Sequence, residues 1–347
     1  MKLPTLFSQW KRKALTTALV AVSFAISSTH ADDDVIVWRL QTHNPQSSWT
    51  YQHDTVAFAE RLHERTGGRL KLEVHPAGSL FPTKEIFNAV QRGIIPIGTV
   101  TPGYITNRSE LAGIAFGLPN SFHNVWEAAH FFFNKGFEQA FRDDLLEKHG
   151  IYWATSVFFP TEMVVKKPIE SVEDLKSSKI RSSGILQKFL TESGASASMI
   201  PGEEIYQALA TGVVDGAHWG AVTGAASLNL YEVAKYHVRP PISIASNGIM
   251  INKKAMDKLP PDIREILIST LNEHVWTTTA HNEIDESIML RNVQAQHGVK
   301  LIHLPESVRT AMNKAALKSW SQEAERGDTA ARQIETMKAL LSELGYL

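Results

Sequence analysis

The chain has 347 residues, of which 43% are hydrophobic and 20% charged, and this composition is typical of a globular protein rather than a disordered one. Its 35 basic and 36 acidic residues nearly cancel, whereas a nucleic-acid-binding protein normally gathers a basic excess on one face. The absence of cysteine excludes disulfides, thiolate metal sites, a cysteine nucleophile and a lipidated amino-terminal cysteine. We therefore expect no nucleic-acid partner and no direct membrane anchor. At this length two domains are expected.

The first 31 residues have the pattern of a secretory signal peptide. Basic residues at positions 11–13 precede a weakly apolar run at 14–26, and small residues then lead to a predicted cleavage after Ala31. The run is shorter than the roughly 20 apolar residues that a transmembrane helix needs. The pattern favours export, the alternative being an amphipathic or buried first helix.

Hydrophobic periodicity then predicts strands and helices in alternation. A first group has strands at residues 35–40, 70–75 and 94–100 and helices at residues 49–66 and 83–92. Short connections in a β-α-β-α-β order are typical of a parallel sheet covered by helices. The first group therefore predicts one α/β lobe.

A second group of the same kind follows later in the chain. Its expected strands are residues 162–166, 179–181, 196–200 and 213–218. A capping box at residues 171–174 predicts the start of a short helix, and two further helices are expected at residues 185–193 and 203–211. Two similar groups predict two lobes of related architecture. We place the first lobe at residues 32–157, the second at residues 158–245, and a crossover with carboxyl-terminal helices at residues 246–347.

One further segment bears on the architecture. Between Pro261 and Gly298 the chain has no proline or glycine, and apolar residues recur at helical spacing. A helix of this extent would be roughly 50 Å long at 1.5 Å per residue, which is longer than one lobe is wide. We expect it to lie across both lobes, the alternative being two helices broken near residues 277–279.

The sequence lacks the common motifs of enzymes. It contains no nucleophile elbow, phosphate-binding glycine loop, dinucleotide fingerprint or zinc-binding His-Glu-x-x-His motif. The 14 histidines are scattered, without the spacing of metal ligands. We therefore expect no catalytic residue, cofactor or metal.

Two residues point to a binding pocket. Arg181 ends a predicted strand just before a helix start, which is where open α/β sheets bind ligands and where a helix amino terminus attracts anions. An arginine there can grip a carboxylate through two parallel hydrogen bonds, unless it pairs with a neighbouring acidic residue. Trp219 ends the next strand and is followed by small residues, so it fits a pocket wall as well as a core position.

Several spaced segments closely resemble TRAP-transporter substrate-binding proteins. The resemblance is strongest at residues 204–219, with residues 179–181 upstream, and it runs over essentially the whole mature chain. Residues 231–236 extend it to a subgroup that handles 2-oxo and 2-hydroxy acids. The other matching segments are residues 75–80, 89–93 and 117–119.

The resemblance implies a two-lobed α/β periplasmic binding protein, type II-like, which captures a small organic carboxylate in the cleft between its lobes. It implies a monomeric receptor in the periplasm that serves TRAP membrane subunits, and it implies that Arg181 pairs with the carboxylate. The other positions expected at the ligand are Trp219, His43, Thr101, Thr161, Phe81 and Thr83, with Tyr104 and Phe159 added for their aromatic side chains. These aromatics fit a planar acid as well as a small hydroxy acid.

One position departs from the oxo-acid subgroup, in which a glutamate before the tryptophan can hold a metal ion. This chain has His218 there, and a neutral imidazole is a poor ligand for calcium or sodium. We expect His218 to bind the ligand by a hydrogen bond instead. Glu162, near the expected pocket mouth, fits a solvated strand position or a contact with the amino group of a zwitterion.

Two other functions remain compatible with the sequence. A sensing partner of a membrane receptor would share this fold and pocket, and loss of uptake on deletion would distinguish the transporter from it. An exported enzyme acting on a small acid would turn its ligand over, and the lack of a nucleophile–base pair disfavours it.

Overall fold

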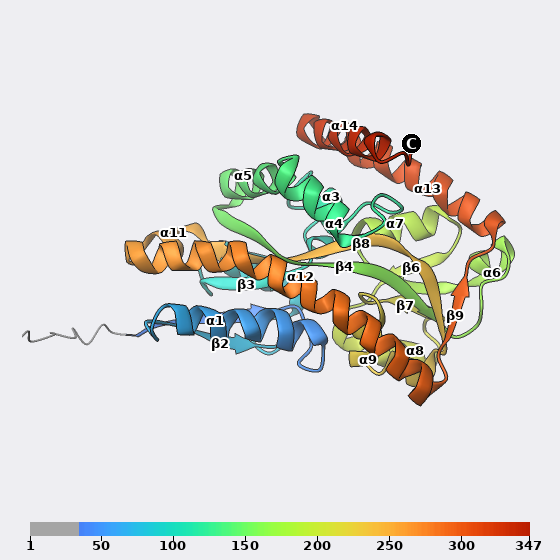
Figure 1. Ribbon diagram of the computed structural model, residues 1–347, viewed down its shortest axis with the longest axis horizontal. Helices are drawn as coiled ribbons and strands as arrows, with labels where there is room; N and C mark the ends of the chain where they lie inside the picture. The colour runs from blue at the N-terminus through green and yellow to red at the C-terminus, as the bar shows by residue number, and fades with distance from the viewer. Residues whose placement is uncertain (1–34) are drawn as a thin grey trace, which may run out of the picture. The chain divides into compact units, whose positions relative to one another are not determined.

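Strands from the whole described chain, residues 35–347, join into one sheet in this computed structural model (Figure 1). Within these residues the sheet has nine strands, in the order β2-β1-β3-β8-β4-β7-β5-β6 with β9 beside β8. The strands are β1 (Ile36–Thr42), β2 (Leu70–His75), β3 (Ile97–Val100), β4 (Ile151–Val165), β5 (Lys179–Ser182), β6 (Ser196–Met199), β7 (Gly216–His218), β8 (Tyr236–Asn252) and β9 (Lys300–His303). The predicted signal peptide, residues 1–31, lies outside the described residues.

Helices cover this sheet and fill the carboxyl-terminal third of the chain. They are α1 (Ala57–Arg65), α2 (Ile86–Gln91), α3 (Ala112–Phe116), α4 (Val125–Ala129), α5 (Phe137–His149), α6 (Val172–Ser177), α7 (Gly184–Glu192), α8 (Ile205–Thr211), α9 (Val222–Ser227), α10 (Leu230–Val233), α11 (Lys253–Asp257), α12 (Pro261–His297), α13 (Glu306–Ala324) and α14 (Asp328–Glu343). Short π-helical turns occupy Tyr51–Val56 and His130–Asn134, and short 3-10 turns occupy Thr83–Glu85, Pro102–Tyr104 and Gly202–Glu204.

Two parallel groups of strands stand on either side of an antiparallel centre. β1 pairs in parallel with β2 and β3, and β5 pairs in parallel with β6 and β7. The long strands β4 and β8 pair with each other antiparallel, while β8 joins the first group through β3 and β4 joins the second through β7. This arrangement confirms the predicted two-lobed α/β architecture. The predicted lobe boundaries fall inside β4 and β8, and they stay a prediction.

The sequence prediction missed most of the two long strands. The expected strand at residues 162–166 covers only the last four residues of β4, and β8 was not expected at all. Both strands are buried along nearly their whole length, so neither shows the alternation of polar and apolar residues that marks a half-exposed strand. β3 also starts three residues later than expected, at Ile97, directly after Pro96.

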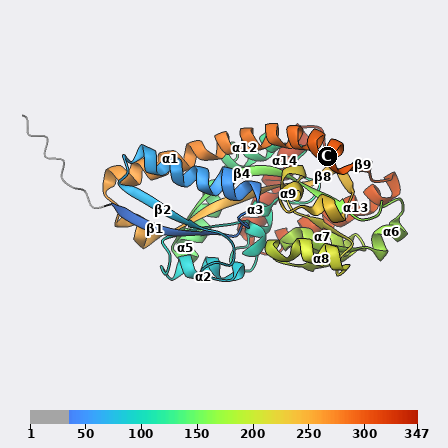
Figure 2. The same ribbon diagram turned by 90° about the horizontal axis from the view of Figure 1, so that it is seen from below.

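The segment expected to span both lobes is one helix, α12, and the alternative of a break near residues 277–279 is wrong. Near its start Ile263 and Leu267 pack in a hydrophobic cluster with β1 and β2, and near its end Val293 packs in another cluster with α8 and α9. In the middle, Thr279 Oγ1 accepts a hydrogen bond of 3.0 Å from the backbone N–H of Phe158 in β4. Figures 1 and 2 show α12 lying along one face of the sheet, beside α1.

Two local features of the second lobe follow from the sequence as predicted. Ser171 caps α6, because its hydroxyl accepts a hydrogen bond of 3.1 Å from the N–H of Asp174. α8 ends at Gly212, whose φ of 79° lies in the left-handed region that glycine tolerates best. These two signals place β5 and β7, the strands that carry Arg181 and His218, at the expected points of the chain.

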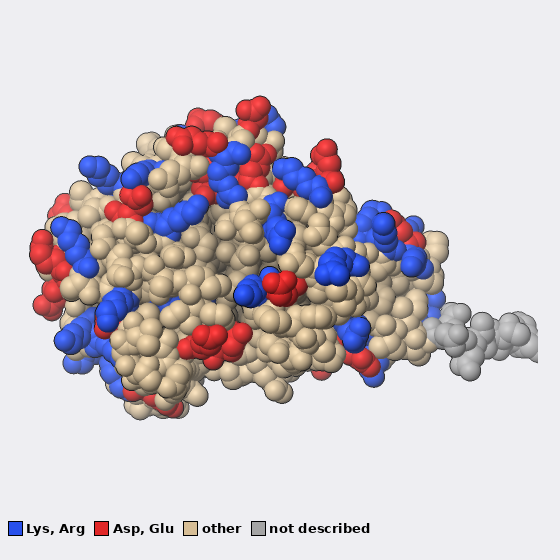
Figure 3. Space-filling view, turned by 180° about the vertical axis from the view of Figure 1, so that it is seen from behind, with Lys and Arg blue, Asp and Glu red and all other residues tan. Residues whose placement is uncertain are grey.

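The surface mixes charges of both signs. Figure 3 shows lysine and arginine side chains interspersed with aspartate and glutamate over one face, which fits the near-equal totals of the sequence. Between residues 35 and 347, no helix combines the length and the apolar character required to cross a lipid bilayer.

Candidate ligand-binding site

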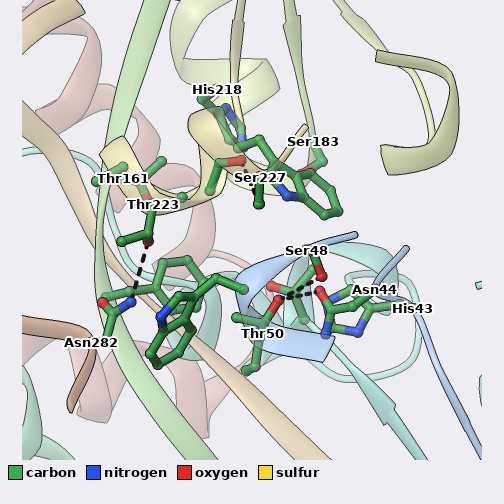
Figure 4. A pocket seen from close by; sticks show the side chains of 18 of the residues that line it. His43, Asn44, Ser48, Thr50, Thr161, Ser183, His218, Thr223, Ser227 and Asn282 are labelled. Carbon is green, nitrogen blue, oxygen red and sulfur yellow. Dashed lines mark hydrogen bonds between the residues drawn. The ribbon is translucent and has the colours of Figure 1, made fainter. Parts of the chain in front are cut away.

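A cavity of about 600 Å³, including its mouth, is lined by residues of both lobes and of α12. Most of the lining follows the carboxyl ends of β1, β3, β5 and β7, which is where α/β sheets bind ligands. Figure 4 shows part of the lining at close range. The lining residues are His43, Asn44, Ser48, Trp49, Thr50, Thr101, Tyr104, Phe116, Phe159, Thr161, Arg181, Ser183, His218, Trp219, Gly220, Ala221, Thr223, Gly224, Ser227, Asn247, Asn282 and Glu286.

The structure brings eight of the ten predicted ligand-contacting residues together around this cavity. The eight are Arg181, Trp219, His218, Thr161, Phe159, Thr101, Tyr104 and His43. They come from five separate stretches of the chain, so the fold and not the sequence order makes them neighbours. That each contacts a ligand stays a prediction.

The other two predicted residues, Phe81 and Thr83, do not line the cavity. The backbone of Phe81 is held by Gln41, which accepts from its N–H at 2.9 Å and donates to its carbonyl at 2.7 Å. Thr83 donates a hydrogen bond of 3.3 Å to Glu203 in the opposite lobe. The loop after β2 therefore contacts the second lobe beside the cavity rather than inside it.

Arg181, at the end of β5, is 1% exposed and carries the cavity's cationic group. Its Nε donates to the carbonyl of Ile200 and its Nη1 to the carbonyl of His218, both at 2.8 Å. These bonds fix the plane of the guanidinium and go to carbonyls rather than to a carboxylate, so they do not neutralise its charge. Burial lowers the pKa of Arg181 from its usual value, and Nη2 has no hydrogen-bond partner.

Trp219 forms a wall beside this guanidinium and is not a core residue. Its half-buried ring lies under Arg181, with the Arg181 Cζ 5.3 Å from the ring centroid, a distance suited to a cation–π contact. Gly202 makes room for the indole, because a Cβ at Gly202 would lie 2.4 Å from the ring carbon Cη2. The glycine before α8 therefore helps to set where Trp219 stands.

Two buried histidines in the cavity wall are neutral. Burial, and next the Arg181 charge, lower the pKa of His218 well below its usual value, and its Nδ1 lies 3.0 Å from the Ser182 hydroxyl. Burial lowers the pKa of His43 to about 4. The His43 Nδ1 lies 3.2 Å from the carbonyl of Thr99 and donates to it, which leaves Nε2 as an acceptor.

Several buried polar atoms of the cavity have no hydrogen-bond partner. Among the described residues, nine buried side-chain atoms have no hydrogen-bond partner, and five of these belong to lining residues. The five are Tyr104 Oη, Thr161 Oγ1, Arg181 Nη2, Asn247 Oδ1 and Asn282 Oδ1. Buried polar atoms are normally paired because leaving one unpaired costs about 1–3 kcal/mol. Their convergence indicates that the cavity is built for a polar ligand.

Sequence reasoning missed several lining residues, above all Asn247 in β8 and Asn282 and Glu286 in α12. Asn247 was missed because β8 itself was missed. A signal for the α12 residues was present, since polar side chains recur every four residues and mark one buried polar stripe. The stripe is His274, Thr278, Asn282 and Glu286, all 6% exposed or less.

Glu162 corrects one of our expectations. It is not a solvated strand residue, because it is 3% exposed and accepts a hydrogen bond from His237, whose other ring nitrogen lies 2.7 Å from the Tyr231 hydroxyl. Arg239 adds an ion pair at 3.2 Å. Glu162 is also absent from the cavity lining, so its contacts join β4 to β8 and do not place it against an amino group of a ligand.

The described residues contain no group of three or more histidine, aspartate or glutamate side chains arranged to hold a metal ion. At the position where the oxo-acid subgroup has its glutamate, His218 offers a neutral nitrogen, and its Nδ1 is engaged with Ser182. The residues present therefore do not fit a calcium or sodium ion of the subgroup's kind.

Known proteins resemble this chain over most of its length. A family model described as bacterial extracellular solute-binding protein, family 7, matches residues 41–326. The chain is 26% identical over 343 residues to the monocarboxylate 2-oxoacid-binding periplasmic protein of Nostoc sp., an alignment that covers 95% of this chain and 91% of the relative. It is also 26% identical to the C4-dicarboxylate-binding periplasmic protein of Rhodobacter capsulatus, over 82% of this chain and 85% of the relative.

Solved structures agree with this. A TRAP transporter solute-binding protein from Bordetella bronchiseptica RB50, described with copurified calcium and picolinate, has 25% identity and a TM-score of 0.82, covering 90% of this chain and 93% of that one. A TRAP periplasmic solute-binding protein from Pseudoalteromonas atlantica has 21% identity and a TM-score of 0.83, covering 90% of this chain and 95% of that one, and it shares the fold. The family predicted from the sequence motifs is confirmed: this protein belongs to the bacterial extracellular solute-binding proteins of family 7, the receptors of TRAP transporters.

Proposed function

We propose that this chain binds a small organic monocarboxylate in the cavity, outside the cytoplasm, and delivers it to TRAP membrane subunits. The observation that carries the proposal is Arg181, a buried cation in the cavity wall whose Nη2 has no partner. A buried charge that makes no ion pair is costly, and a bound carboxylate offsets that cost. The relative from Nostoc sp. is named for 2-oxoacids and the Bordetella structure for picolinate, and each such ligand carries one carboxylate.

Aromatic rings enclose the rest of the ligand in this proposal. Trp219, Phe159 and Tyr104 line the cavity around Arg181 and offer flat apolar faces. Such walls accept a planar acid and also hold a small 2-oxo or 2-hydroxy acid against the guanidinium. His218 and His43 supply neutral hydrogen-bonding nitrogens that add no competing charge.

Binding would also join the lobes. Two hydrogen bonds already cross the molecule beside the cavity: Thr83 donates to Glu203 at 3.3 Å, and the Trp49 indole N–H donates to Asp285 of α12 at 2.7 Å. A ligand that contacts both lobes adds to these bonds and favours the closed arrangement. We propose that membrane subunits recognise the closed arrangement.

We propose binding without turnover, as for the relatives, which are named as binding proteins. The test is a thermal-unfolding screen of small organic acids against the primary amides of the same acids, with recovery of the bound compound by mass spectrometry. An acid at about 100 times its Kd should add about 2.7 kcal/mol by mass action and raise Tm by several degrees. The amide should not, because it leaves Arg181 without a counter-charge. Equal stabilisation by acid and amide, or recovery of a changed compound, contradicts the proposal.

A further inference from the structure

Three side chains at one wall of the cavity form a chain of hydrogen bonds. Glu286 of α12 accepts from the backbone N–H groups of Val222 at 2.7 Å and Thr223 at 3.1 Å, at the start of α9. It also accepts a hydrogen bond from the Thr223 hydroxyl. Asn282, one helical turn before Glu286, places its Nδ2 3.4 Å from Thr223 Oγ1 (Figure 4). The chain of bonds therefore runs from Glu286 through Thr223 to Asn282.

The direction of these bonds fixes the orientation of the Asn282 carboxamide. A hydroxyl has one hydrogen, and Thr223 donates it to Glu286, so Thr223 Oγ1 can only accept from Asn282. Only the NH₂ side of a carboxamide donates, so that side faces Thr223 and Oδ1 lies on the opposite side. Asn282 is 2% exposed and lines the cavity, and its Oδ1 is buried without a partner.

We propose that Asn282 Oδ1 reads a hydrogen-bond donor of the ligand, and that Glu286 and Thr223 are the positioning residues that hold it in this orientation. The inference rests on the proposed carboxylate binding and narrows its ligand class. The ligand is an acid that also carries a hydroxyl or an N–H group. An acid of the same shape without a donor would bury Oδ1 unpaired, which reduces affinity about tenfold or more.

Two other unpaired groups of the cavity, those of Thr161 and Arg181, do not make this distinction. The Thr161 hydroxyl can donate or accept, so it satisfies a ligand donor or acceptor equally. Arg181 Nη2 only donates and reads the carboxylate. Asn282 is set apart by the carboxylate of Glu286 behind it, which determines the direction of every hydrogen bond in the chain.

The experiment measures Kd by calorimetry for three pairs of acids that differ in a donor: lactate and propionate, mandelate and phenylacetate, pyroglutamate and cyclopentanecarboxylate. It is run at pH 8 so that Glu286, whose pKa burial raises to about 7, is ionised. In the pair that contains the tightest binder, we expect the donor-bearing acid to bind at least about tenfold more tightly. Asn282→Leu should remove this preference by weakening the donor-bearing acid alone.

Variants of Thr223 test the positioning role. Thr223→Val keeps the side chain's shape but frees the carboxamide to turn, so the preference should fall, whereas Thr223→Ser should restore it. A preference that survives both Asn282→Leu and Thr223→Val overturns the inference, and so does an unmodified protein that binds both members of each pair equally. If both members of each pair bind equally and Arg181→Ala abolishes their binding, the inference about Asn282 fails but the proposed function stands. If no acid binds, both fail together.

Discussion

Single residues set the polarity of the cavity, and they do so by burial. Arg181 is 1% exposed and donates hydrogen bonds to the carbonyls of Ile200 and His218, while burial keeps the two histidines of the wall neutral. The cavity thus presents one cation among uncharged donors and acceptors, with the Glu286 carboxylate occupied by α9. We expect this pattern to favour an acid with one carboxylate over an acid with two.

The first residue-scale prediction concerns metal. His218 offers nitrogen where the oxo-acid subgroup offers a carboxylate, so ligand binding should not need calcium. We expect the Kd of a bound acid, measured by calorimetry, to stay within about twofold after exhaustive treatment with a calcium chelator, since no coordination bond is lost. Loss of binding that added calcium restores would show that oxygen ligands complete a metal site despite His218.

The sequence predicted those cavity residues whose position follows from a local pattern, and it missed those whose position depends on contacts between distant elements. Arg181 and Trp219 were predictable because strand ends beside glycine and small residues mark the edge of a sheet where ligands bind. The polar stripe of α12 marked Asn282 as a buried polar position, but its role and that of Thr223 were not predictable, because they depend on which face of α12 meets α9 and on the direction of a hydrogen bond. Glu162 was misjudged because no local pattern in β4 indicates that His237 and Arg239 of β8 pair with it.

At the scale of elements, α12 packs against both lobes and also carries a buried carboxyl group, that of Glu286, with a raised pKa. Burial raises the pKa of Glu286 to about 7 against an ordinary value of 4.5, although hydrogen bonds from Thr223 and Val222 lower it. The folded protein therefore binds a proton more readily than the unfolded chain between about pH 4.5 and 7. Stability from this group is present below that window and is lost as pH rises through it.

We expect the free energy of unfolding of the unmodified protein, relative to Glu286→Gln, to fall by up to about 3 kcal/mol between pH 4.5 and pH 8. Urea unfolding of both proteins across this range measures the difference. Glu265→Gln, an exposed position on the same helix, is the matched control and should show no such trend. If the difference in free energy of unfolding between the unmodified protein and Glu286→Gln stays constant with pH, Glu286 has the same pKa in the folded and unfolded states, which contradicts this prediction.

The elements differed in how far the sequence predicted them. α12 was predictable because a long run without proline or glycine has helical spacing, and Gly212 and Ser171 marked helix ends. β4 and β8 were not, because strands buried on both faces lose the period of two, and β8 even contains Pro240 and Pro241. The order of strands in the sheet also follows from long-range pairing that no local pattern encodes.

At the scale of the whole molecule, β4, β8 and α12 connect two parallel groups of strands with the cavity between them. Both lobes supply lining residues, so we expect a ligand in the cavity to contact both at once. Arg181 lies in the second lobe, whereas His43 and Tyr104 approach from the first. The central claim is that the Arg181 charge is the main source of affinity for an acid in this shared cavity.

The measurement that tests this claim most directly is calorimetric titration of the best acid from the screen into Arg181→Ala, Arg181→Lys and the unmodified protein. Arg332→Ala, which removes an exposed arginine of α14, is the matched control and should bind normally. We predict a loss of about 3 kcal/mol for Arg181→Ala, on the order of a hundredfold in Kd, because a charged partner is removed from a buried pair. Arg181→Lys should recover only part of the affinity, since an ammonium cannot reproduce the planar fork. Unchanged affinity in a folded Arg181→Ala protein, shown by its circular dichroism and Tm, would contradict the account.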